Sequence, residues 1–216
     1  MNKAVVLDLD GTLMETIEDI RCALNIMLKK FGYPEITSER TRQIINHGAK
    51  ELVKNAIPEK LSEEKFNECY DEYKKIYFNL DCKKTYVYQG MQEFITACKN
   101  AGYKVCIATN KQVSKTKSLC EEKLPDFKFD AILGIDEGVI PKPDPTFTLK
   151  MLESLDVNPQ DAYFIGDGDT DVITSLRAGT KGISVLWGYR NQSQLSKVGA
   201  KIFAKTPADL LNLIKL

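Results

Sequence analysis

The stretch that decides the fold is residues 4–13, AVVLDLDGTL, in which an apolar run passes directly into two aspartates and a glycine. Lys3–Leu7 is short and lacks strict alternation of apolar and polar residues, which is typical of a strand buried on both faces. Asp8 and Asp10 follow where this strand ends, and Gly11 favours a turn. Ligands of open α/β sheets bind beyond the carboxyl ends of the strands. The stretch therefore predicts a parallel sheet with two carboxylates at its functional edge.

Further apolar runs recur along the chain and are separated by amphipathic segments. The runs are Lys104–Ala108, Phe129–Leu133, Ala162–Ile165, Gly182–Leu186 and the weaker Lys201–Ala204. Helices are expected at Met91–Asn100 and Pro145–Leu155, the second one beginning at a typical Asp-Pro start. Alternation of strands and helices predicts an α/β fold with a Rossmann-like, doubly wound parallel sheet.

Residues 15–83 interrupt this alternation, because their apolar residues recur at helical spacing only. Helices are expected at about 17–31, 38–46, 50–56 and 66–80. We therefore predict an α/β core domain made of residues 1–14 and 84–216. A helical domain of residues 15–83 is predicted to be inserted directly after the first strand.

Polar side chains follow four of the predicted strands. They are Asp8 and Asp10, then Thr109 and Asn110, then Lys142, and finally Asp167, Asp169 and Asp171. These groups are expected to converge, because the carboxyl ends of parallel strands meet at one edge. A carboxylate can attack phosphorus as a nucleophile, and a hard cation such as Mg²⁺ would offset its repulsion by phosphate. A lysine and a threonine can bind phosphate oxygens, so the pattern predicts phosphoryl transfer with Mg²⁺ as cofactor.

These residues also carry a family resemblance. The run Asp8-Leu9-Asp10-Gly11-Thr12-Leu13 resembles the first motif of the haloacid dehalogenase-like (HAD) hydrolase superfamily. Segments similar to the second, third and fourth motifs follow in order: Thr109-Asn110, Lys142-Pro143 and Gly166 to Asp171. The resemblance covers nearly the whole chain, and the helical insertion resembles the α-helical cap of the family. The run Trp187-Gly188-Tyr189-Arg190 and the layout are most similar to the phosphoglycolate phosphatase branch.

The resemblance implies a role for each matching residue. Asp8 would be the nucleophile, and Asp10 would protonate the leaving oxygen and later deprotonate the attacking water. The metal ligands would be Asp8, Asp10 through its backbone carbonyl, Asp167 and Asp171, with Asp171 alternatively orienting Lys142. Substrate phosphate would be held by Thr109, Lys142 and the backbone at Asn110. Asp169 is left outside the ligand set, since it is expected only to cap the following helix.

His47, the single histidine, lies in the predicted cap between two helices. Histidine titrates near neutral pH, and the family's cap approaches the active site, so His47 is a candidate substrate contact. The competing interpretation is an exposed polar residue, which is the more frequent state of a lone loop histidine.

The predicted function is a Mg²⁺-dependent phosphatase that hydrolyses a small, phosphoglycolate-like phosphate monoester through an aspartyl phosphate. Asp10 argues against a dehalogenase or a phosphonatase, because related enzymes of those kinds lack a second aspartate there. A sugar-phosphate phosphomutase, or a pyrophosphatase or nucleotidase on the same core, stays open as an alternative. A non-catalytic binding protein on this fold is disfavoured, since such a protein would be expected to lose these carboxylates.

Composition limits the partners and the compartment. Basic and acidic residues balance at 30 each, which argues against a nucleic-acid surface. Asp8 and Asp10 interrupt the first apolar run too early for a membrane span or secretory signal. The six cysteines form no CxxC pair, so buried thiols in a reducing compartment are expected. We therefore expect a cytoplasmic enzyme, monomeric or homodimeric, acting on a small phosphorylated metabolite and binding neither nucleic acid nor membrane.

Overall fold

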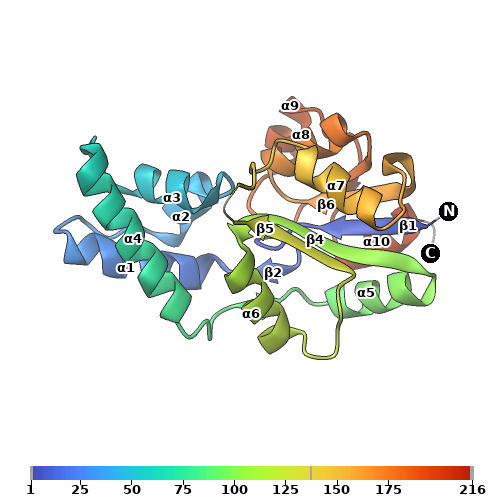
Figure 1. The fold of residues 1–216 in the computed structure, drawn as a ribbon, viewed down its shortest axis with the longest axis horizontal. Helices are drawn as coiled ribbons and strands as arrows, with labels where there is room; N and C mark the ends of the chain where they lie inside the picture. The colour runs from blue at the N-terminus through green and yellow to red at the C-terminus, as the bar shows by residue number, and fades with distance from the viewer. Residues whose placement is uncertain (1, 137, 215–216) are drawn as a thin grey trace. The chain divides into compact units, whose positions relative to one another are not determined.

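The computed structural model describes residues 2–136 and 138–214 (Figure 1). The chain divides into two compact units, one made of Met1–Glu15 and Val87–Leu216, and the other of Thr16–Tyr86. We call the first the core unit and the second the helical unit. Two short strands, β2 (Met14–Glu15) and β3 (Tyr86–Val87), pair with each other where the chain passes between the units.

The core unit is built on a six-stranded sheet in the order β5-β4-β1-β6-β7-β8, in which neighbouring strands run parallel. The strands are β1 (Lys3–Leu7), β4 (Tyr103–Gln112), β5 (Ala131–Ile135), β6 (Ala162–Gly166), β7 (Lys181–Val185) and β8 (Phe203–Ala204). All six lie where apolar runs predicted strands, so the predicted α/β class is confirmed. The one marked difference is β4, which continues to Gln112 instead of ending at Ala108, with a register shift between these two residues.

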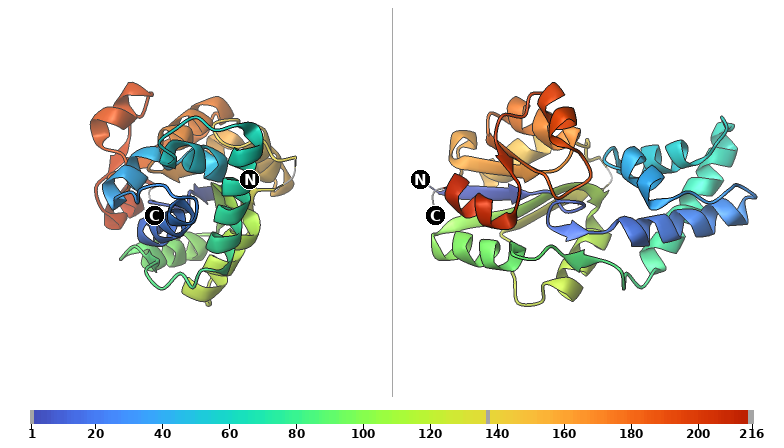
Figure 2. Two further views of the ribbon diagram at one scale, coloured as in Figure 1. Left: turned by 90° about the vertical axis from the view of Figure 1, so that its left-hand side faces the viewer. Right: turned by 180° about the vertical axis from the view of Figure 1, so that it is seen from behind.

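Helices cover both faces of this sheet (Figure 1 and Figure 2). One face carries α5 (Met91–Asn100), α6 (Val113–Lys123) and α10 (Pro207–Leu213), and the other carries α7 (Thr146–Ser154) and α8 (Asp169–Ala178). The short helix α9 (Gln192–Lys197) precedes β8, and a 3₁₀ turn, Pro159–Asp161, precedes β6. The strand order reverses at β1, which lies between β4 and β6. Binding sites in doubly wound sheets open at such a reversal.

The central strands are anchored by an apolar cluster beneath α7. Val6 of β1 lies opposite both Cys106 of β4 and Phe164 of β6 in the sheet register. All three side chains are buried, and they belong to one cluster with Leu152 of α7. The predicted state of the cysteines also holds, since all six are free thiols and only Cys22 is more than marginally exposed. The strands whose ends carry the polar residues are therefore held in place by a tightly packed apolar cluster.

The helical unit contains the four helices that its apolar spacing predicts. They are α1 (Ile17–Lys30), α2 (Ser38–Ile44), α3 (Gly48–Ala56) and α4 (Glu63–Asn79). Thr37 and Ser62 cap α2 and α4, since their hydroxyl oxygens accept hydrogen bonds from backbone N–H groups in the first turn. The Asn25 amide of α1 bonds both the N–H and the carbonyl of Ile36, which fixes the segment leading into α2.

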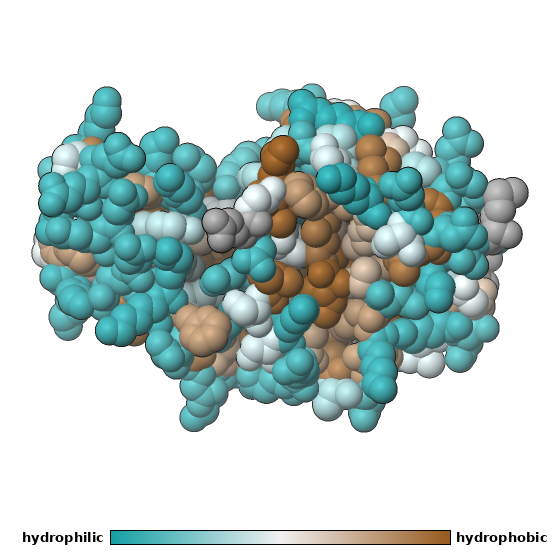
Figure 3. Space-filling model, viewed as in Figure 1, coloured by the Kyte–Doolittle hydropathy of each residue, from teal (hydrophilic) through white to brown (hydrophobic). Residues whose placement is uncertain are grey.

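The visible surface is mostly hydrophilic, with apolar side chains gathered over the β5 edge of the core unit (Figure 3). Ala131 and Leu133 of β5 are only partly buried, which agrees with the position of β5 at the end of the sheet. Within residues 2–136 and 138–214, no helix combines the length and apolar character needed to span a bilayer.

The packing beneath α7 predicts how unequally two leucines contribute to stability. Leu152 is fully buried, whereas Leu176 of α8 is 56% exposed. Leu152→Ala is expected to lower the free energy of unfolding by about 2–5 kcal/mol, because it leaves a cavity in the core. The matched change Leu176→Ala is expected to cost less than about 1 kcal/mol. Urea denaturation measures both, and equal losses would contradict this description of the core.

Candidate active site

Three aspartates gather where β1 and β6 end side by side. Asp8 follows β1, and its backbone N–H donates to the carbonyl of Ile165 in β6 over 2.9 Å. Asp167 follows β6, and Asp171 lies in the first turn of α8. Each offers a carboxylate oxygen, and these oxygens all lie within 4.8 Å of one another. All three residues are buried, so the sheet topology concentrates negative charge in a place with little solvent.

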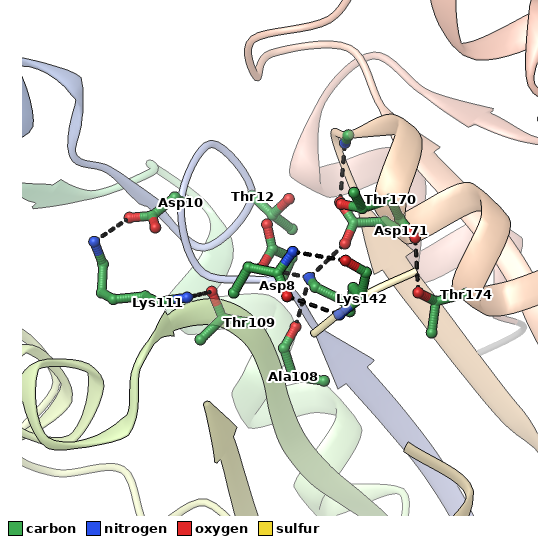
Figure 4. A network of polar contacts seen from close by, with 12 residues as sticks. Asp8, Asp10, Thr12, Ala108, Thr109, Lys111, Lys142, Thr170, Asp171 and Thr174 are labelled. Carbon is green, nitrogen blue, oxygen red and sulfur yellow. Dashed lines mark hydrogen bonds and ion pairs between the residues drawn. The ribbon is translucent and has the colours of Figure 1, made fainter. Parts of the chain in front are cut away.

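The Lys142 ammonium contacts two of these carboxylates, those of Asp8 and Asp171 (Figure 4). Its Nζ is 2.8 Å from Asp8 Oδ1 and 2.5 Å from Asp171 Oδ1, and it donates a third hydrogen bond to the Ala108 carbonyl over 2.8 Å. A buried lysine requires such partners, because an unpaired ammonium away from water is costly. The Lys142 ammonium therefore connects the loop that carries it to the end of β1 at Asp8 and to the first turn of α8 at Asp171.

Asn110 holds the backbone of Lys142 in place. Its Oδ1 accepts the Lys142 N–H over 2.8 Å, and its Nδ2 donates to the Lys142 carbonyl over 3.0 Å. The side chain of Asn110 therefore positions the lysine. The predicted phosphate contact through the backbone of Asn110 stays a prediction. Asp171 likewise has two contacts, because its Oδ2 accepts the Gly168 N–H at the start of α8 over 2.9 Å. The expectation that Asp169 caps this helix is wrong, since the N-cap residue is Gly168 and Asp169 is the first residue of the helix.

The pKa values of the buried Asp8, Asp167 and Lys142 are shifted by burial and by the charges close to them. Burial, and after it repulsion from Asp171, raises the pKa of Asp8 to about 7, although the nearby Lys142 ammonium acts in the opposite direction. Burial, Asp8 and Asp171 likewise raise the pKa of Asp167 well above its usual range. Burial alone would lower the pKa of Lys142, but Asp171 and Asp8 more than offset this, so the lysine stays charged. Three carboxylates around one ammonium leave a surplus of negative charge, which a divalent cation would neutralise.

Asp167 is surrounded closely by backbone, and two of the neighbouring residues must be glycine to leave room for its side chain. Its Oδ1 accepts the Thr12 hydroxyl over 3.1 Å, and its Oδ2 accepts the Tyr189 N–H over 2.7 Å. A Cβ on Gly11, whose φ is +83°, would lie 2.4 Å from Asp167 Oδ2, and one on Gly188 would lie 2.3 Å from Asp167 Cβ. These contacts explain why the first motif and the Trp-Gly-Tyr run contain glycine at these positions.

Asp10 lies outside the group of three carboxylates. Its Oδ1 is 2.9 Å from Nζ of Lys111, and the lysine side chain is only 5% exposed (Figure 4). Thus three of the four predicted metal-ligand residues bring carboxylates together, while the side chain of Asp10 forms a separate ion pair. Sequence reasoning missed Lys111, although it directly follows Thr109 and Asn110. The predicted strand ends at Ala108, and the candidate residues named after it are only Thr109 and Asn110.

A second set of contacts missed from the sequence links the site to Glu15. Tyr189, which donates its N–H to Asp167, donates its phenol O–H to Glu15 Oε1 over 2.9 Å. The phenol of Tyr88 donates to Glu15 Oε2 over 3.1 Å, and Trp187 Nε1 donates to the carbonyl of Thr12 over 3.1 Å. The aromatic residues near β7 thus brace the first motif, a role that the Trp-Gly-Tyr spacing alone does not reveal.

Of the two remaining predicted site residues, Thr109 lies in the core unit and His47 lies in the helical unit. Thr109 lies in β4 at the edge of the site, is buried, and accepts the Lys111 N–H at its Oγ1 over 3.3 Å. His47 belongs to the helical unit, where it directly precedes α3 and is exposed. The predicted substrate contact of His47 stays a prediction.

Comparisons with known proteins agree with this arrangement. Residues 5–185 match the family model of the haloacid dehalogenase-like hydrolases. The chain belongs to this family. It is similar to a phosphoglycolate phosphatase of Aquifex aeolicus (strain VF5), at 32% identity over 98% of this chain and 96% of that protein. A phosphoglycolate phosphatase of Nitrosospira multiformis (strain ATCC 25196 / NCIMB 11849 / C 71) is 32% identical over 87% of this chain and 84% of its own.

A solved structure from Lactobacillus delbrueckii subsp. bulgaricus, named provisionally as a phosphoglycolate phosphatase, has the same fold. It superimposes with a TM-score of 0.90 at 26% identity, and the match covers 99% of both chains. The predicted superfamily and its phosphoglycolate phosphatase-like branch are confirmed by these similarities.

The raised pKa of Asp8 predicts a pH-dependent penalty on folding in the metal-free protein. Between the ordinary pKa of 3.8 and about 7, the folded protein retains a proton that the unfolded chain releases, so stability falls as pH rises through this window. Asp8→Asn removes the penalty, so its stability relative to wild type should increase from pH 4 to 7 and then level off. The upper bound is about 4 kcal/mol, at about 1.4 kcal/mol per pKa unit.

Urea denaturation in the presence of chelator, repeated across this pH range, measures the difference. Asp126→Asn, at an exposed aspartate of the same unit, is the matched control and should follow the wild-type curve. A constant difference between Asp8→Asn and wild type at all pH values would contradict the raised pKa.

Proposed function

We propose that this protein is a Mg²⁺-dependent phosphatase that hydrolyses a small phosphate monoester of the phosphoglycolate type. The observation that carries the proposal is the buried group of Asp8, Asp167 and Asp171 around the Lys142 ammonium. This set supplies a nucleophile, oxygen ligands and a fixed cation at one place. Similarity over nearly the full length to relatives named phosphoglycolate phosphatase supports the choice of substrate.

The donor set fits Mg²⁺. Asp8 and Asp167 would hold the ion, together with the backbone carbonyl of Asp10 and with Asp171 directly or through water. All donors are hard oxygen atoms, which Mg²⁺ prefers, and the unbalanced negative charge matches a divalent cation. When bound, the ion would neutralise phosphate charge and so let an anionic nucleophile approach an anionic substrate.

In the first step, an Asp8 carboxylate oxygen attacks phosphorus, the bond from phosphorus to the ester oxygen breaks, and an aspartyl phosphate forms. Asp10 gives its proton to the departing oxygen, which leaves as an alcohol. The Lys142 ammonium, held 2.8 Å from Asp8 Oδ1, would stabilise the charge on the phosphoryl oxygens, and the Thr109 hydroxyl would donate to one of them.

In the second step, water attacks the phosphorus of the aspartyl phosphate. Asp10, now a carboxylate, takes a proton from this water, and the bond between phosphorus and the Asp8 oxygen breaks. The products are the free Asp8 carboxylate, inorganic phosphate and a protonated Asp10, so the enzyme returns to its starting state. One residue serves as acid and then as base because the leaving group and the water approach from the same side.

Phosphate release from a substrate panel tests the proposal. The panel contains phosphoglycolate, sugar phosphates, nucleotides and pyrophosphate, with Mg²⁺ or with chelator. Asp8→Asn is expected to lower kcat by more than about 10³-fold and Asp10→Asn by about 10²–10⁴-fold, and chelation should abolish turnover. Full activity of Asp8→Asn would exclude it as the nucleophile. Isomerisation of a sugar 1-phosphate without phosphate release would support the phosphomutase alternative instead.

Metal binding is tested separately by thermal unfolding. Saturating Mg²⁺ should raise the Tm of the wild type by about 2–8 °C relative to chelator, because it binds only the folded state and relieves carboxylate repulsion. Asp167→Asn should lose most of this shift, while the control Asp126→Asn keeps it. An equal Mg²⁺-dependent shift in Asp167→Asn would contradict the assigned ligand set.

A further inference from the structure

Lys111 is a second buried cation at the candidate site. Its side chain is 5% exposed, and its Nζ is 2.9 Å from Oδ1 of Asp10, whose side chain is 14% exposed. In Figure 4, Lys111 and Asp10 lie on one side of Asp8, and Lys142 and Asp171 lie on the other. The site therefore has two cationic ends, and only the Lys142 end is used by the mechanism described above.

The chain holds Lys111 at this position through its immediate neighbours. The register shift between Ala108 and Gln112 interrupts the alternation of β4, so consecutive side chains can serve the same site. The Lys111 N–H donates to the Thr109 hydroxyl oxygen, and the side chain of Asn110 binds the backbone of Lys142. The position of Lys111 is thus tied to the groups that would bind the substrate phosphate.

The ion pair between Lys111 and Asp10 is incompatible with the acid–base role proposed for Asp10. To serve the leaving oxygen, the carboxyl group of Asp10 must turn toward the substrate and away from Lys111. A lysine this deeply buried would then lose its 2.9 Å contact with a carboxylate, and breaking a buried ion pair is costly in a protein interior. The cost disappears when another anion takes the place of Asp10 on the lysine.

We propose that Lys111 determines specificity by binding a carboxylate of the substrate, which replaces Asp10 on the ammonium and releases Asp10 toward the leaving oxygen. This inference rests on the proposed phosphatase function and deepens it. The exchange replaces the carboxylate of Asp10 by that of the substrate, so the charge around Lys111 is unchanged. The released Asp10 carboxylate takes up a proton from water before it serves the leaving oxygen as an acid. The substrate class that follows is a short phosphate monoester whose alcohol part carries a carboxylate next to the ester-bearing carbon.

Two substrates that differ only in this group provide the test. In ethyl phosphate, a methyl group replaces the carboxylate of phosphoglycolate. The measured quantity is the ratio of kcat/KM for phosphoglycolate to kcat/KM for ethyl phosphate, at saturating Mg²⁺. Lys111→Met is expected to lower this ratio about 100-fold, mainly through KM for phosphoglycolate, because the carboxylate loses a buried partner. Lys111→Arg, which keeps the charge, should retain a larger part of the ratio.

Lys104→Met is the matched control. Lys104 lies on the same strand and also pairs with an aspartate, since its Nζ is 3.2 Å from Asp130 Oδ1, but it lies near the opposite end of β4. The ratio is expected to stay at the wild-type value in this variant.

The outcomes separate the possible failures. If Lys111 merely positions Asp10, Lys111→Met lowers kcat for both substrates equally and leaves the ratio unchanged, which overturns the inference. A wild-type ratio near one overturns it even if Lys111→Met fails to fold, and leaves the proposed phosphatase function intact. Wild-type enzyme that releases phosphate from neither substrate, nor from the wider panel, overturns both.

Discussion

The site depends on the contact of one buried ammonium with two carboxylates. Lys142 bonds Asp8 and Asp171, and these three residues come from a loop, a strand end and a helix start that are far apart in the sequence. Removing the lysine leaves buried carboxylates without compensation, at a cost of about 3–5 kcal/mol. The contact therefore fixes the three segments relative to one another. Asn110 strengthens this by bonding the lysine backbone on both sides.

Sheet topology creates the crowding of charge, and the apolar core sustains it. Because β1 lies next to β6, Asp8 and Asp167 emerge side by side, and α8 adds Asp171 one turn later. Three carboxylates around a single lysine are unfavourable for folding, as the raised pKa of Asp8 indicates. The packed cluster beneath α7 offsets this cost. Part of the stability supplied by the core is thus used to hold a site suited to a divalent cation.

Local patterns in the sequence predicted the strands, the helices and the convergence of their polar ends, because each depends on nearby residues. The predicted β4 strand is too short, because the apolar run ends at Ala108, whereas the register shift lets the strand continue through polar residues to Gln112. The pairing of Lys111 with Asp10 cannot be predicted from a local pattern, because Lys111 lies in β4 and Asp10 follows β1, about 100 residues earlier in the sequence. For the same reason the sequence predicted that Asn110 belongs to the site, but not that its amide holds Lys142.

The hydrogen bonds of Glu15 connect the site to the point where the chain leaves the core unit. Tyr189 binds Asp167 through its N–H and Glu15 through its phenol, so one residue contacts both the carboxylate group and β2. Tyr88, just after the chain returns, donates to the same carboxylate. The segments where the chain leaves and re-enters the core unit are therefore both hydrogen-bonded, through Glu15, to the residue that contacts Asp167. Because Tyr189 donates to both carboxylates, its position depends on Asp167 and on Glu15 together.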